Sequence, residues 1–282
     1  MDIVEDRGVE TIAVAESAAT GALVRVAIWA RRDITQNAFA CFFQRAQRNA
    51  MTDPLHQSAR TVLVAGASGL VGREILQGLL ADASTAAVHT VGRRELRLEH
   101  PKLTQHIVDL KALPALPRVD EAFIALGTTI KVAGSQAAFR AVDFDAVVAV
   151  AKAAKAAGAT RLGVVSAMGA DARSSVFYNR VKGDTEAALS ALGFETLVIA
   201  RPSFLAGDRE ALGQPLRSGE ALALNVSRWL APLIPDNYRS IDARRVARAL
   251  LNAVSATQGR RVLLSGEMQR QAIPSRPPSS VP

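Results

Sequence analysis

The chain has 282 residues, of which 49% are hydrophobic and 21% are charged, and its mean hydropathy is +0.14. This composition is typical of a globular protein and excludes wholesale disorder. No uncharged apolar run of about 18 residues occurs, so a membrane-spanning helix is excluded. The single cysteine, Cys41, excludes a disulfide framework and a cysteine-based metal site, and the four histidines are too scattered to predict a metal site.

The formal net charge of +8 lies mainly toward the carboxyl terminus. Residues 1–60 have no net charge, residues 61–200 carry +2 and residues 201–282 carry +6, mostly from arginine. These arginines are thinly spread, and aromatic residues make up only 5% of the chain. A solvated surface near an anionic cofactor is therefore favoured over the alternative, a polyanion-binding face, and we expect no nucleic-acid partner.

The two ends of the chain differ from its middle. Residues 1–50 show no sustained period and lack the basic leading region of a secretory signal, and Met51 begins a polar lead-in to a strong apolar strand. We interpret Met51 as the native start and residues 1–59 as a poorly structured extension. Residues 269–282, rich in proline and serine, are expected to be disordered. The folded part is expected to span 60–268, in a reducing, cytoplasmic compartment.

In the middle, short apolar runs alternate with longer stretches of helical periodicity. The runs predict strands at residues 61–65, 87–91, 103–108, 121–126, 161–165, 195–200 and 261–265. The longer stretches predict helices at residues 70–81, 135–157, 177–192, 221–233 and 242–254. This alternation predicts an α/β protein with a doubly wound parallel sheet, the Rossmann fold. We expect residues from about 203 to 260 to form a small substrate lid.

A glycine-rich loop joins the first predicted strand to the first predicted helix. Its residues are Gly66, Ala67, Ser68, Gly69, Leu70, Val71 and Gly72. Gly66 suits a tight turn, Gly69 lets the backbone approach a pyrophosphate, and Gly72 lets the helix pack close to the strand. The amino terminus of the helix would then face the phosphates of a dinucleotide.

Two arginines, Arg93 and Arg94, follow the second predicted strand, where an NAD site normally has a carboxylate. Glu95 lies past both of them. Because a guanidinium can hold a 2′-phosphate through paired hydrogen bonds, NADP is favoured over NAD, the alternative being two ordinary surface arginines. Asp109 and Leu110, after the third strand, either flank the adenine or belong to a surface loop.

The chain has only two tyrosines, yet Tyr178 lies four residues before Lys182 on a predicted helix. This spacing puts both side chains on one helix face. A phenol is a poor proton relay at pH 7 until a nearby ammonium stabilises its phenolate. Ser166, at the end of the fifth predicted strand, has a hydroxyl suited to polarising a carbonyl, and Ser174 and Ser175 compete for that role. The alternative for the pair is an ordinary amphipathic helix face.

Together these motifs resemble the short-chain dehydrogenase/reductase superfamily. Further segments resemble the Tat-interacting-protein-like branch of its atypical members, which bind NADPH: residues 125–129, 133–143, 165–170 and 177–183. The resemblance covers about residues 60–268. It implies that the cofactor is lined by the glycine loop and by Arg93, Leu126, Gly127, Thr128, Tyr178, Lys182, Pro202, Ser203 and Phe204.

The sequence departs from the superfamily pattern at two positions. Asp143 stands where many members have an asparagine, and Met168 stands where extended members have a serine. The resemblance implies an NADP(H)-dependent oxidoreductase acting on a small carbonyl or alcohol, with Tyr178 as the acid and base. A non-catalytic NADPH-binding regulator with a protein partner is the alternative. A sugar-nucleotide epimerase is disfavoured because the carboxy-terminal region is short.

Overall fold

The computed structural model describes residues 59–110, 112–206 and 235–271. The predicted helix at 221–233 lies outside these residues. So do residues 1–58, which make up nearly all of the predicted amino-terminal extension, and residues 272–282 of the predicted tail. No helix of the described part is long and apolar enough to cross a membrane.

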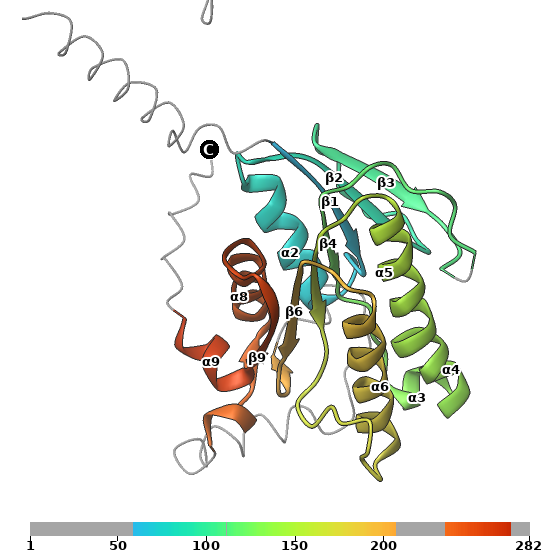
Figure 1. Ribbon diagram of the computed structural model, residues 1–282, viewed down its shortest axis with the longest axis vertical. Helices are drawn as coiled ribbons and strands as arrows, with labels where there is room; N and C mark the ends of the chain where they lie inside the picture. The colour runs from blue at the N-terminus through green and yellow to red at the C-terminus, as the bar shows by residue number, and fades with distance from the viewer. Residues whose placement is uncertain (1–58, 111, 207–234, 272–282) are drawn as a thin grey trace, which may run out of the picture. The chain divides into compact units, whose positions relative to one another are not determined.

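Seven parallel strands form one sheet in the order β3-β2-β1-β4-β5-β6-β9 (Figure 1). The strands are β1 (Arg60–Ala65), β2 (Thr85–Gly92), β3 (Leu103–Ile107), β4 (Glu121–Ile124), β5 (Arg161–Val165), β6 (Thr196–Arg201) and β9 (Gly259–Leu264). The strand order reverses between β1 and β4, the place where such sheets bind ligands at the carboxyl ends of their strands. This arrangement confirms the predicted doubly wound α/β fold.

Helices cover both faces of the sheet (Figure 1). The longer ones are α2 (Leu70–Ala81), α5 (Val147–Ala156), α6 (Phe177–Ala191) and α8 (Ala243–Ala256). The shorter elements are α3 (Ile130–Ala133), α4 (Gln136–Arg140), α9 (Ser265–Arg270), the 3-10 turn η4 (Asp236–Tyr238) and the paired strands β7 (Leu205–Ala206) and β8 (Ile241–Asp242). Buried side chains of α2 and α8 join one core cluster, and those of α5 and α6 join the other.

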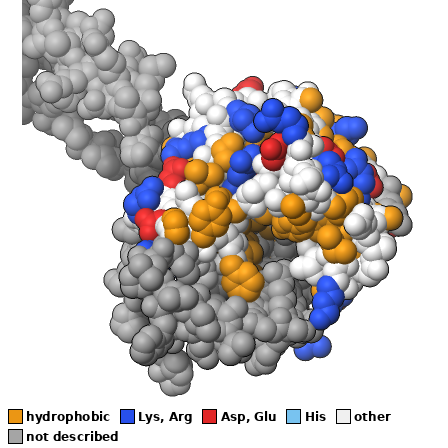
Figure 2. Space-filling model, turned by 90° about the horizontal axis from the view of Figure 1, so that it is seen from below, with side chains coloured by type: hydrophobic (Ala, Val, Ile, Leu, Met, Phe, Trp, Pro, Cys, Tyr) orange, Lys and Arg blue, Asp and Glu red, His pale blue; other side chains and the backbone are white. Residues whose placement is uncertain are grey.

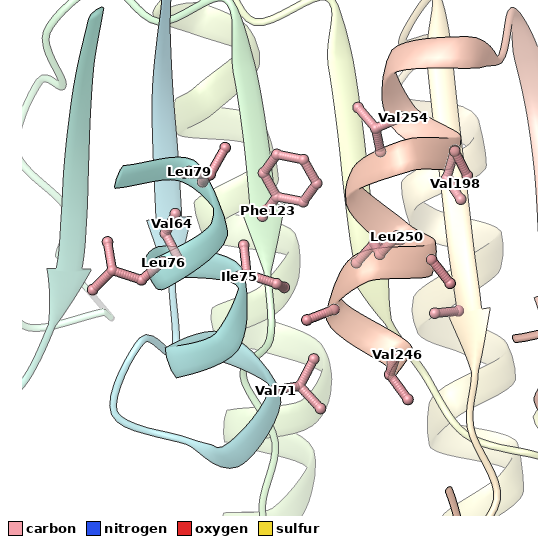
Figure 3. Packing of buried hydrophobic residues seen from close by; sticks show 14 of the residues in the cluster. Val64, Val71, Ile75, Leu76, Leu79, Phe123, Val198, Val246, Leu250 and Val254 are labelled. Atoms are coloured by element: carbon pink, nitrogen blue, oxygen red, sulfur yellow. The ribbon is translucent and has the colours of Figure 1, made fainter. Parts of the chain in front are cut away.

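Helix α8 lies within the segment 203–260 that we expected to form a lid, but it belongs to the core. Figure 3 shows Val246, Leu250 and Val254 on its inward face, opposite α2 and beside Phe123 of β4. These three side chains are fully buried. Their spacing of four residues forms an apolar stripe that must pack against the sheet, so this helix is part of the framework that carries the site.

The predicted helix at 135–157 is not one continuous α-helix. It consists of α4, a π-helical stretch named η2 (Ala141–Ala146), and α5. Apolar periodicity does not reveal such a stretch, because one inserted residue shifts the register without ending the helix. π-helical turns are often found at functional sites, and this one contains Asp143.

Candidate functional site

The residues of the candidate site gather at one edge of the sheet, where β1, β4, β5 and β6 end. Figure 2 looks onto this edge, from the end to which the strands point, and shows hydrophobic side chains gathered on it. The loops that follow these four strands carry the glycine motif, the segment from Ala125 to Thr129, Ser166, and Pro202.

The glycine loop has the geometry that a dinucleotide needs. Gly66 has a φ of +86°, and a Cβ there would lie 2.5 Å from the Ala125 carbonyl oxygen. A Cβ on Gly72 would lie 2.1 Å from the Gly66 oxygen. At Gly69, by contrast, φ is −87° and a Cβ would meet only the Gly66 oxygen, at 3.4 Å. The protein's own packing therefore does not require a glycine at position 69, whereas close approach of a pyrophosphate does.

Helix α2 begins directly after Gly69, with no side-chain cap and no acidic residue in its first turn. The amide groups of this turn therefore meet no competing carboxylate, and the helix terminus favours an anion. The other loop residues support the turn: Ala67 and Val71 are buried in the core, Leu70 packs against it, and Ser68 is exposed. These residues fit a bound dinucleotide.

Arg93 and Arg94 are exposed immediately after β2. Within the described residues neither guanidinium forms an ion pair. They are thus available to an external anion. Asp109 is exposed. Leu110 is 8% exposed and belongs to the core cluster that contains the buried side chains of α5 and α6.

Lys182 forms an ion pair with Asp143 in the interior of the site. Its Nζ lies 2.7 Å from Asp143 Oδ1, and the side chains are 7% and 0% exposed. The Thr128 amide donates to Asp143 Oδ2 at 2.9 Å. A Cβ on Gly127 would lie 3.4 Å from Asp143 Oδ1 and 3.8 Å from Lys182 Nζ, which are ordinary contact distances, so the loop passes directly beside this ion pair. Asp143, which stands where many superfamily members have an asparagine, therefore joins the loop after β4 to α6. Leu126 of the same loop packs against the core.

Tyr178 lies in the first turn of α6 and is partly exposed. Its ring lies 5.3 Å from that of Phe139, centroid to centroid. Sequence reasoning overlooked the importance of Gly183: a Cβ there would lie 2.0 Å from the Ala172 nitrogen. The loop between β5 and α6 therefore lies directly on the helix, which fixes Tyr178 and Lys182 relative to the strand ends.

Ser166 is buried, and its hydroxyl donates to Glu186 Oε1 at 2.6 Å. Glu186 also accepts hydrogen bonds from Arg201, at 2.9 Å from Nε and 2.6 Å from Nη2. These bonds raise the pKa of the Arg201 guanidinium above its usual value, although burial opposes the shift. Sequence reasoning missed Glu186 and Arg201; the available signal was the position of Glu186, four residues after Lys182 on the same helix.

The loop after β6 is tied to the rest of the site through its backbone. The Pro202 carbonyl accepts from the Met168 amide at 3.0 Å, which joins the loops after β5 and β6. The Ser203 hydroxyl donates to the Arg239 carbonyl. Phe204 is 37% exposed. The described part of the chain contains no group of three or more side chains suited to a metal ion.

The amino-acid sequence was compared with those of known protein families and proteins. Residues 66–229 match the profile of the NAD(P)H-binding family. The chain belongs to this family. Protein HTATIP2 of Rattus norvegicus is 36% identical to this NAD(P)H-binding protein over 219 residues, which span 74% of this chain and 87% of that protein. The relation confirms the resemblance to the Tat-interacting-protein-like branch.

Further matches are a second sequence relative and two solved structures. Protein FMP52, mitochondrial, of Coccidioides immitis is 34% identical over 211 residues, 68% of this chain and 85% of that protein. The solved structure of MoeE5 with UDP-glucuronic acid and NAD has a TM-score of 0.56 at 20% identity, over 73% of this chain and 76% of that chain. The UDP-glucose 4-epimerase of Thermotoga maritima has a TM-score of 0.56 at 15% identity, over 73% and 77%. At these identities the two solved structures show the fold alone. The cytoplasmic location of the protein stays a prediction.

Proposed function

We propose that the protein is an NADP(H)-dependent oxidoreductase that acts on a small carbonyl or alcohol. The observation that carries this proposal is the placement of Tyr178 and Lys182 on α6, at the sheet edge where the glycine loop opens. Membership of the NAD(P)H-binding family supplies the cofactor class. The two exposed arginines after β2, which form no ion pair with a described residue, favour the form with a 2′-phosphate.

Each part of the cofactor has residues suited to it. The first turn of α2, with Gly69, would hold the pyrophosphate, and Arg93 and Arg94 would hold the 2′-phosphate. Lys182 and the loop at Gly127 would hold the ribose next to the nicotinamide. The bound cofactor supplies the hydride in the reaction.

The protein's own chemistry is then proton transfer at the Tyr178 hydroxyl. No hydrogen bond from that hydroxyl to a described residue competes with a substrate. The phenol protonates a carbonyl oxygen in reduction and accepts the alcohol proton in oxidation. Asp143 holds the Lys182 ammonium in place on the same helix face.

A second function, a non-catalytic NADPH-binding regulator, is favoured by two contacts. The Ser166 proton is engaged by Glu186, and the Lys182 charge is balanced by Asp143. The Ser166 hydroxyl and the Lys182 ammonium therefore each already have a partner within the protein. A regulator needs only the residues that would hold the cofactor, and it needs neither a free Ser166 hydroxyl nor a proton relay at Tyr178.

One experiment separates the two functions. NADPH consumption is measured against a panel of small aldehydes and ketones, beside an equilibrium titration with NADPH. The oxidoreductase predicts steady consumption with at least one carbonyl. Tight NADPH binding without consumption across the panel would instead support the regulator.

A further inference from the structure

Gln105, on the edge strand β3, binds one loop through three hydrogen bonds. Its Oε1 accepts from the Leu96 amide at 2.7 Å, and its Nε2 donates to the carbonyl oxygens of Leu96 at 3.1 Å and Leu98 at 3.0 Å. The side chain thus satisfies both backbone groups of Leu96, as a neighbouring strand would. No helix or strand contains the bound segment, so these bonds replace regular secondary structure.

The same loop is attached to the sheet at a second point. The Val108 amide donates to the Gly92 carbonyl oxygen at 2.9 Å, at the end of β2. Only three residues separate Gly92 from Leu96, and all three are exposed: Arg93, Arg94 and Glu95. The arginines that we assign to the 2′-phosphate therefore lie between two fixed points of the backbone.

The surroundings of the loop make the Gln105 hydrogen bonds important. The loop borders an open hollow of about 580 Å³ lined by Glu95, Leu96, Arg97, Leu98, Glu99 and Gln105. The Leu96 side chain packs against the core cluster on the α2 side of the sheet, and the three Gln105 hydrogen bonds fix the backbone on either side of it. A released loop would also let Glu95 exchange places with the arginines, and a carboxylate repels a phosphate.

We propose that Gln105 is a positioning residue for cofactor specificity: it holds the loop so that Arg93 and Arg94, and not Glu95, face the 2′-phosphate. The inference rests on the proposed NADP role of the two arginines and adds a residue that does not touch the cofactor. Its contribution is to order the loop before binding, which reduces the entropy lost when the phosphate is bound.

The test compares Gln105→Met with the wild type and with a control on the same strand, Thr104→Val. Methionine keeps the length of the side chain and removes all three hydrogen bonds. Dissociation constants for NADP and NAD are measured by calorimetry for each protein. We expect the affinity of Gln105→Met for NADP to fall on the order of fivefold or more, with NAD affinity little changed. Thr104→Val should keep the wild-type preference.

A double-mutant cycle distinguishes positioning from a general structural effect. In a protein that already carries Arg93→Ala and Arg94→Ala, Gln105→Met should cause no further loss of NADP affinity. If Gln105→Met lowers the melting temperature so far that binding cannot be measured, Gln105→Ala serves in the same cycle.

The outcomes separate this inference from the proposed function. If the arginine variants lose NADP affinity while Gln105→Met keeps the wild-type ratio of NADP to NAD affinity, the positioning role is wrong and the cofactor assignment stands. If the arginine variants bind NADP as tightly as the wild type, the cofactor assignment itself is wrong and the positioning role falls with it. Equal losses for NADP and NAD in Gln105→Met would also overturn the inference.

Discussion

The ammonium of Lys182 lies 2.7 Å from a carboxylate oxygen of Asp143, and the two side chains are 7% and 0% exposed. The second carboxylate oxygen accepts the Thr128 amide at 2.9 Å. The Thr185 hydroxyl donates to the Asp143 carbonyl at 2.9 Å. One residue of the π-helical stretch therefore connects the loop after β4 with two turns of α6, and it does so beside the proposed proton donor.

The first prediction concerns Asp143. Removing one partner of a buried ion pair leaves the other charge unpaired, which costs about 3–5 kcal/mol. Asp143→Ala should lower the free energy of unfolding by that order, measured by chemical denaturation. Asp143→Asn keeps the acceptor for Thr128 and should cost less. Asp145→Ala, at an exposed position, is the matched control; an equal effect at 145 and 143 would show that the pair does not stabilise the fold.

The second prediction concerns cofactor choice. A charged hydrogen bond to a phosphate contributes about 1.5–3 kcal/mol, so replacing both Arg93 and Arg94 by alanine should weaken NADP binding about tenfold or more. NAD binding should stay nearly unchanged, because that cofactor lacks the 2′-phosphate. Arg97→Ala, which removes an exposed charge from the same loop, is the control. Equal affinity of the wild type for NAD and NADP would refute the assignment.

The third prediction separates two roles of Ser166. Because its hydroxyl donates to the buried Glu186 carboxylate, Ser166→Ala should lower the free energy of unfolding by about 1.5–3 kcal/mol. Ser175→Ala, at an exposed position nearby, should have no such effect. Unchanged stability together with a large loss of turnover in Ser166→Ala would show that the serine acts on the substrate directly.

The fourth prediction concerns pH. Burial, followed by the neighbouring His106 ring, lowers the pKa of His89 below its usual 6.5, and the two rings approach to 3.1 Å between Nδ1 and Nε2. The unfolded chain therefore binds more protons than the folded chain just below pH 6.5, and stability falls as the pH drops through that range.

Denaturation of the wild type and of His89→Gln, from about pH 8 to about pH 5, measures this effect. The acid slope of the unfolding free energy should be shallower in His89→Gln than in the wild type. A slope that is the same in wild type and His89→Gln would contradict the assignment of the effect to this ring.

The framework of the site could be predicted because its signals are local. The apolar run at 161–165 and the helical pattern at 70–81 coincide with β5 and α2. The three glycines of the loop were identified because their spacing repeats a known turn. Each of these features is determined by residues close together in the sequence, within one strand, one helix or one loop.

The contacts inside the site could not be predicted in the same way. Ser166 and Glu186 are twenty residues apart, and Gln105 contacts a loop that precedes it by nine residues. Such pairs depend on how strands and helices come together in three dimensions, and neither hydropathy nor spacing records them. The π-helical stretch around Asp143 was hidden for a related reason, since it lies within a continuous helical pattern.

The central claim is that Tyr178 transfers a proton to or from a carbonyl or alcohol substrate. Tyr178→Phe removes only a hydroxyl, and the matched control is Tyr238→Phe at the chain's other tyrosine, which is 67% exposed. The measurement is the rate of NADPH oxidation with a reducible carbonyl, beside the NADPH affinity of each variant. We expect Tyr178→Phe to keep the affinity and to lose about a hundred- to ten-thousandfold in turnover, while Tyr238→Phe keeps both. Full turnover by Tyr178→Phe on a verified substrate would contradict the claim.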